Sequence, residues 1–115
     1  MVRLNLAVGD VVRSKEFDRN VALGGNVDKY VGSTVHNEDL QKAEFVVTHK
    51  SRYDSVGDRG EAHAEIIVIQ KLHKNGKYNP KGMVVWFYTN GLISAVNYVD
   101  ESQIKVIRRL KQSFA

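Results

Sequence analysis

The sequence contains no cysteine and a single proline among its 115 residues. Without thiols, the protein can form neither a disulfide framework nor a thiolate metal site, and this composition fits a reducing compartment. No apolar run approaches the roughly 18 residues of a membrane-spanning helix. The first eight residues are too short and too interrupted to form the apolar region of a signal peptide. We therefore expect a cytoplasmic protein without a membrane partner.

Positive charge is present in excess and is unevenly placed along the chain. The length and the hydrophobic share of 43% are those of one globular domain, residues 1–115. Residues 1–40 carry five Lys or Arg and six Asp or Glu, a net charge of −1. Residues 41–115 carry twelve and seven, a net charge of +5. A surplus of this kind in one part of a chain favours a polyanionic partner.

Short apolar segments with a period of two residues predict β-strands. These segments are residues 11–13, 32–36, 43–49, 63–72, 83–89 and 92–98. Because residues 66–69 are apolar on both faces, we expect their strand to be central in a sheet and covered on both sides. Asn90-Gly91 between two apolar runs predicts a tight hairpin, since a type I′ turn needs positive φ at both positions.

Three segments without a sustained period predict loops. Residues 14–28 contain Gly24-Gly25-Asn26, and residues 51–65 are rich in charged residues and glycine. We expect the second of these segments to be solvated. Residues 72–83 contain Pro80 and predict a long hairpin loop rather than a buried element.

The C-terminal segment, residues 100–112, allows two interpretations. Asp100 with Gln103 resembles a capping box, and Val99 with Ile104 would form a hydrophobic staple, which favours a helix. Residues 104–107 are mostly β-branched and favour a closing strand after a short helical turn. We prefer the strand, and the sequence leaves both interpretations open.

Several short strands, polar turns and no long helix indicate a mainly all-β fold, and so small an antiparallel sheet most naturally closes into a barrel. The stretches VGDVVRSKEF and YVGSTVHNEDLQKAEFVVTH resemble the start of small SH3-like barrels of the KOW and Tudor type. The matching positions are Gly9, Asp10, Val12, Gly32, Val35, Phe45 and Val47. The segment VDESQIKVI resembles the turn and last strand that close such barrels. The resemblance implies an SH3-like barrel in which the Gly-Asp turn orients the first strand. The loop between Leu72 and Met83 and its long flanking strands are larger than a minimal barrel needs, so we expect such a barrel with a long β-hairpin.

The loop KLHKNGKYNPK is the first candidate site. It contains Lys71, Lys74, Lys77, Tyr78 and Lys81 and no acid. Lysines contact phosphates, and an aromatic ring among them can stack on a base. The alternative is a solubilising loop in which Tyr78 folds back onto the barrel.

A second group of cations lies near the C-terminus, where Lys105, Arg108, Arg109 and Lys111 follow Glu101 without an intervening acid. On a strand, Lys105 and Arg109 share one face and Arg108 lies on the other, whereas on a helix the three cluster. Either arrangement can contact phosphates, and a solvated end is the alternative. We expect this tail and the basic loop to lie on one side of the protein.

Recognisable motifs for catalysis or cofactor binding are missing from the sequence. Asp54, Asp58, Glu61 and His63 lie within one stretch, but their spacing matches no metal-ligand motif. No P-loop, dinucleotide-binding fingerprint or nucleophile motif is present. We therefore expect no enzymatic activity, no cofactor and no metal, and an enzyme that uses the stretch from Asp54 to His63 is the weakest hypothesis.

These observations predict a non-catalytic β-barrel that binds DNA or RNA through phosphate contacts. Sequence specificity should be low, because nothing in the sequence indicates a helix suited to the major groove. The alternative is a protein-interaction module or a small accessory inhibitor that docks on a larger, nucleic-acid-handling enzyme.

Overall fold

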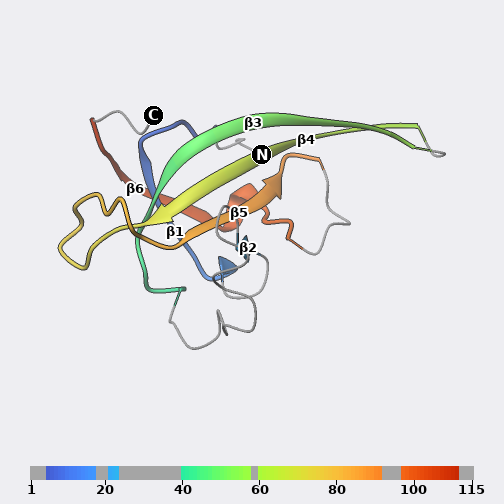
Figure 1. The fold of residues 1–115 in the computed structure, drawn as a ribbon. Helices are drawn as coiled ribbons and strands as arrows, with labels where there is room; N and C mark the ends of the chain where they lie inside the picture. Colours follow the sequence, from blue (N-terminus) through green and yellow to red (C-terminus); the bar gives the residue numbers. More distant parts are fainter. Residues whose placement is uncertain (1–4, 18–20, 24–39, 58–59, 92–96, 112–115) are drawn as a thin grey trace.

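Six strands form one antiparallel sheet in the computed structural model, in the order β2-β5-β4-β3-β1-β6 (Figure 1). The structure describes residues 5–17, 21–23, 40–57, 60–91 and 97–111. The strands are β1 (Asp10–Ser14), β2 (Ala22–Leu23), β3 (Phe45–Gly57), β4 (Gly60–Lys71), β5 (Val84–Thr89) and β6 (Ile104–Arg109). The predicted all-β fold class is confirmed. Within the described ranges, no helix is long and apolar enough to cross a membrane.

A tight turn at Gly9 and Asp10 leads the chain into β1. The backbone of Gly9 has a positive φ of 99°, and a side chain there would meet the carbonyl oxygen of Leu110 at 2.8 Å. The carboxylate of Asp10 accepts a hydrogen bond of 2.9 Å from the amide of Ala7. β1 then pairs with β3 on one side and with β6 on the other. The turn thus sets the direction of a strand that lies between two neighbours.

The long hairpin of β3 and β4 corrects the prediction of a solvated loop at residues 51–65. The two strands stay paired as far as Gly57 and Gly60. Figure 1 shows them extending as an arm well beyond the rest of the sheet. Opposite charges face each other along the arm, with Arg52 opposite Glu65, and such cross-strand pairs stabilise antiparallel strands. The charged residues that suggested a loop therefore belong to a two-stranded ribbon.

The larger core cluster lies on one face of the sheet, and a smaller cluster of Val11, Val46 and Leu72 lies on the other. In β4, Ile67 and Ile69 are fully buried, whereas Ile66 and Val68 on the opposite face are half-buried. The strand is central in the sheet, as expected, but the face that carries Ile66 and Val68 is only partly covered. The core residues are Leu6, Val12, Phe17, Leu40, Phe45, Val47, Ile67, Ile69, Val85, Phe87, Val99 and Ile104.

The segment after β1 contributes to this core, although we predicted a loop over residues 14–28. Phe17 is fully buried, and its ring centroid lies 5.4 Å from that of Phe45 in an edge-to-face arrangement. Such a pair contributes roughly 0.5–1.5 kcal/mol beyond its burial. Farther along, β2 pairs with β5. The strand predicted at residues 32–36 lies outside the described residues.

The Asn90-Gly91 turn is present but does not form the expected tight hairpin. Asn90 has a φ of 60° and Gly91 a φ of 139°, so the chain turns where the sequence predicted. The backbone of Tyr88, however, bonds to Asn97 and Val99 in parallel orientation. An antiparallel strand directly after the turn would need the opposite direction at this edge. Residues 92–96 of that predicted strand lie outside the described part.

The C-terminal segment forms the strand that we preferred over a helix. A single 3-10 turn, η2 (Glu101–Gln103), is capped by Asp100, whose side chain accepts a hydrogen bond from the amide of Ser102. β6 then pairs with β1, with one irregularity in register between Val11 and Val12. The segment just before η2 therefore contacts β5, and the segment just after it, β6, pairs with β1.

Candidate functional site

The loop between β4 and β5 is folded against the sheet. The side-chain amide of Gln70 donates to the carbonyl oxygen of Pro80 at 3.0 Å. The hydroxyl of Tyr78 donates to the side-chain oxygen of Gln70, also at 3.0 Å. The ring of Tyr78 is half-buried against a small apolar cluster around Val46. This geometry matches the alternative interpretation of the loop, in which Tyr78 folds back onto the sheet.

Arg108 joins this loop to the C-terminal strand. Its guanidinium donates two hydrogen bonds of 3.0 Å to the carboxylate of Glu44 and one of 3.0 Å to the carbonyl oxygen of Gly76. The hydrogen bond to Arg108 lowers the pKa of Glu44 below its ordinary value, and the same bond raises the pKa of Arg108. Arg108 thus holds the loop and the tail together, and Glu44 matches its charge.

Two adjoining hollows lie where β1 ends. The first, of about 350 Å³, is lined by Arg13, Lys42, Lys71 and Lys74 together with Glu44. The second, of about 390 Å³, shares Arg13 with the first and adds two further cations, at Lys15 and Lys105. We call these six cations the basic rim; they are Arg13, Lys15, Lys42, Lys71, Lys74 and Lys105.

The electrostatics of the basic rim favour an anionic ligand. Among the described residues that line the two hollows, Glu44 is the only acid, and it already pairs with Arg108. Arg13 lies directly opposite Lys105 in the pairing of β1 with β6, and like charges in facing positions destabilise a sheet. An anion bound between them would relieve this repulsion. Cations gathered along hollows also focus the field that attracts a polyanion.

The residues predicted as a site separate into groups. Three of them, Lys71, Lys74 and Lys105, belong to the basic rim. Arg108 and Tyr78 make the contacts within the fold described above. The others are exposed and line neither hollow; they are Lys77 and Lys81 on the loop, and Arg109 and Lys111 at the end of the chain's last strand. The structure therefore brings together only part of the predicted set.

Sequence analysis missed Arg13, Lys15 and Lys42. None of them belongs to an acid-free run, and all lie far along the chain from the two basic segments. A weak signal was present, because Arg13 ends a predicted strand and Lys15 follows it by two residues. Together with a last strand expected to close the sheet against the first, that spacing could have placed them beside Lys105.

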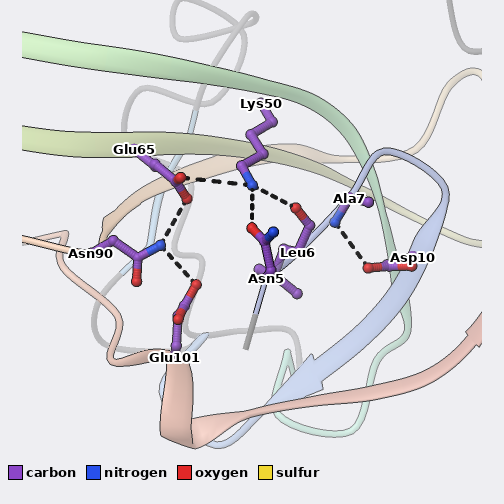
Figure 2. A network of polar contacts seen from close by, with 8 residues as sticks. All are labelled: Asn5, Leu6, Ala7, Asp10, Lys50, Glu65, Asn90 and Glu101. Atoms are coloured by element: carbon purple, nitrogen blue, oxygen red, sulfur yellow. Dashed lines mark hydrogen bonds and ion pairs between the residues drawn. The ribbon is translucent and has the colours of Figure 1, made fainter. Parts of the chain in front are cut away.

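A second cluster of charges, the polar network, lies on the face of the long hairpin that carries the core (Figure 2). The side-chain amide of Asn90 donates to carboxylate oxygens of Glu65 and Glu101, both at 2.8 Å. The ammonium of Lys50 lies 3.7 Å from Glu65 and donates to the side-chain oxygen of Asn5 at 2.8 Å. Glu101 is buried, with 7% of its surface exposed. Each charge of the network thus has a partner from another segment of the chain.

A hollow of about 410 Å³ lies beside the polar network and reaches toward the end of the hairpin. There, Oδ1 of Asp54 accepts from Nε of Arg52 at 2.9 Å and lies 2.6 Å from Nδ1 of His63. The bond to Arg52, followed by the contact with His63, lowers the pKa of Asp54. Asp54 thus matches the charge of Arg52 on its own strand, and Glu65 that of Lys50, so the hollow presents no surplus of positive charge to a polyanion.

The stretch from Asp54 to His63 was also the weakest candidate for catalysis or metal binding. Asp58, one of its four acids and histidines, lies outside the described residues. Among the residues that are described, no group of three or more His, Asp or Glu side chains could hold a metal ion. The contacts of Asp54 with Arg52 and His63 stabilise the two-stranded hairpin of β3 and β4.

No known protein indicates a function for this chain by similarity. No family model, no curated protein sequence and no solved structure matches the chain. The basic rim and the polar network therefore have to be interpreted from their own contacts and charges.

Proposed function

We propose that the protein is a non-catalytic nucleic-acid-binding protein that contacts the phosphate backbone with the basic rim. The observation that carries this proposal is the pair of adjoining hollows that share Arg13. Six cations line them, and the one acid among their described lining residues is paired with Arg108. Such a surface neutralises phosphates and releases their counterions, which is the main source of sequence-independent affinity.

An SH3-like barrel of the KOW and Tudor type is part of the same proposal. Two features support it: the Gly9-Asp10 turn before β1, and a 3-10 turn followed by a last strand paired with β1. The contact of Asn97 and Val99 with β5 brings the segment that leads into β6, at one end of the sheet order, close to β2 at the other end. Closure through this segment would leave few exposed sheet edges.

Low sequence specificity follows from the kind of contact proposed. Phosphate contacts position a protein on nucleic acid but carry no sequence information. The rim consists of Lys and Arg side chains from strand ends and loops, and the described residues include no helix that could enter the major groove. Binding should therefore be weakly selective among sequences and strongly dependent on salt.

The test is a salt titration of duplex DNA and duplex RNA binding with a rim variant. We expect Arg13→Gln/Lys74→Gln/Lys105→Gln to flatten the log–log salt slope by about two to three units, since each phosphate contact contributes about 0.9. The matched control is Lys77→Gln/Lys81→Gln/Lys111→Gln, which removes the same charge from exposed positions outside the hollows. It should change the slope on duplex by less than about one unit.

Two results would reject the assignment. Equal effects of both triple variants would mean that overall charge, and not the basic rim, attracts the polymer. No binding of wild type at low salt would leave the protein-interaction module as the better hypothesis, and pull-down after nuclease treatment would then identify the partner. Circular dichroism and urea unfolding of each variant separate these outcomes from loss of the fold.

A further inference from the structure

Three aromatic side chains form a row across the face of the sheet opposite to the core. Tyr88 of β5 lies between Tyr53 of β3 and Trp86 of β5, with ring centroids 5.3 Å and 5.0 Å away. All three rings are half-buried. We call this row the aromatic strip.

The alternation of β5 explains why these rings point away from the core. Val85 and Phe87 are fully buried, so Trp86 and Tyr88 between and beyond them face the other side. Opposite them in β4 lie Val68 and Ile66, both half-buried. The strip therefore continues onto an apolar surface that the core does not use.

The basic loop is fastened to one end of the same face. Gln70 lies two residues beyond Val68 in β4 and so points to the same side. Its side chain bonds to Tyr78 and to the carbonyl oxygens of Pro80 and Gly82. These bonds fix the backbone on either side of exposed Lys81 at this end of the face, while Lys74 of the same loop belongs to the basic rim. A chain of phosphates could thus run from the rim along the loop to the strip.

We propose that the aromatic strip stacks bases of a single-stranded nucleic acid whose phosphates the loop lysines contact. The proposal rests on the phosphate-binding function assigned to the basic rim and names its preferred polymer. Aromatic faces beside a cationic track are the usual means of binding single strands without sequence preference. The planes of Trp86 and Tyr88 differ by 87°, and those of Tyr53 and Tyr88 by 57°. Faces turned in such different directions suit splayed, unstacked bases and not a duplex.

Trp86 is the single tryptophan of the chain and gives a direct readout of the strip. Wild type is titrated with a twelve-residue oligothymidylate and with a duplex of the same length, and both anisotropy of a labelled strand and tryptophan emission are followed. We expect the single strand to change Trp86 emission saturably, in parallel with binding. The duplex should bind with little change in emission, because it contacts the rim alone.

Variants at Tyr88 test stacking separately from charge. Tyr88→Leu should weaken single-strand binding by about five- to a hundredfold, with the salt slope and the duplex affinity unchanged. Tyr88→Phe keeps the aromatic face and should bind as wild type. Lys77→Gln/Lys81→Gln should instead flatten the slope on single strands by about 1.4 units, or 0.7 for each contact. If Tyr88→Leu does not fold, Tyr53→Leu takes its place, and the emission titration of wild type needs no variant.

The outcomes separate this proposal from the one on which it rests. Salt-dependent binding of both polymers, with Trp86 emission unchanged and Tyr88→Leu equal to wild type, would overturn the strip and keep the rim. Absence of binding to either polymer would overturn both proposals. Emission that changes with protein concentration alone would show that a second copy of the chain covers the strip, which also overturns its assignment to bases.

Discussion

The basic rim and the polar network are both clusters of charge, but their charges are arranged differently. In the polar network, Asn90 bridges two carboxylates and Lys50 contacts one of them. In the basic rim, cations from separate segments line two hollows, and Arg13 directly faces Lys105. In the first arrangement opposite charges lie together, whereas in the second two like charges occupy facing positions.

The number of charged residues in a region therefore does not show whether they stabilise the fold or are available to a ligand. Arg108 illustrates this, since it belongs to the basic tail and yet forms a bidentate bond with Glu44. A charge with a fixed partner contributes to the fold, and a like-charged pair kept in facing positions is tolerated at a cost. Three predictions test how far this distinction holds, in order of decreasing expected effect.

The largest effect is expected from Asn90→Gly in the polar network. Glycine adopts the positive φ of 60° at this position, so the change removes mainly the two hydrogen bonds to Glu65 and to buried Glu101. Hydrogen bonds to charged groups contribute about 1.5–3 kcal/mol each, so for two bonds we expect a loss of about 3–6 kcal/mol in the free energy of unfolding. Urea unfolding measures it, and nucleic-acid affinity of the folded variant should be unchanged.

Asn75→Gly is the matched control for this prediction. Asn75 is exposed, and its side chain accepts one local hydrogen bond from the amide of Lys77. We expect it to cost less than about 1 kcal/mol. Equal losses for the two variants would mean that the polar network contributes nothing special to stability, and the comparison with the rim would fail.

A smaller effect, a gain in nucleic-acid affinity, is expected from Glu44→Gln at the basic rim. The change removes the acid that lines the first hollow and leaves the charge of Arg108 unmatched. Duplex affinity at 0.1 M salt should rise by up to about tenfold, with a salt slope steeper by up to about 0.9. Glu61→Gln, which changes the charge equally on the distant hairpin, is the control and should leave affinity unaltered. Weaker binding by Glu44→Gln would contradict the position of the rim.

The smallest effect is the contribution of Glu44 to the pH dependence of stability. Its pKa is lowered in the folded state by the hydrogen bond to Arg108, so the folded protein binds this proton more weakly than the unfolded chain. The contribution is therefore present above pH 4.5, the ordinary value, and is lost as the pH falls through the lowered pKa. Because the pair is partly exposed, we expect no more than about 0.5 kcal/mol.

Urea unfolding at pH 5, 4 and 3 tests the sign of this contribution. Wild type should lose slightly more stability than Glu44→Gln over this range, because only wild type must protonate the paired carboxylate. Parallel losses would show that the bond to Arg108 does not persist in solution.

Much of the fold was predicted from local sequence patterns, and the predictions that were wrong have local reasons. Strands such as β5 were predicted because successive side chains point to opposite faces of a sheet, which gives the sequence a period of two residues. The hairpin arm was missed because cross-strand charge pairs, such as Arg52 opposite Glu65, look like a solvated loop in sequence. Phe17 was missed because one buried ring in a polar segment has no period.

Less of the candidate site than of the fold could be predicted from the sequence. Lys71, Lys74 and Lys105 were predicted from acid-free runs, and they do line the hollows. Arg13 completes both hollows but lies alone in the sequence, so only the pairing of β1 with β6 brings it there. The exposure of Tyr78 could not be judged either, because Gln70 and the loop carbonyls decide its position.

By itself, the sequence determined the strand-forming segments, the turn at Asn90-Gly91 and the excess of positive charge in its second part, because these depend on neighbouring residues. The tertiary structure decided which cations share a surface, which of them are already paired, and which aromatic rings face away from the core. Those properties depend on pairing between residues far apart in the chain, such as Arg108 with Glu44, 64 residues earlier. Local propensities do not determine such contacts, since they form only when distant strands have paired and packed the core.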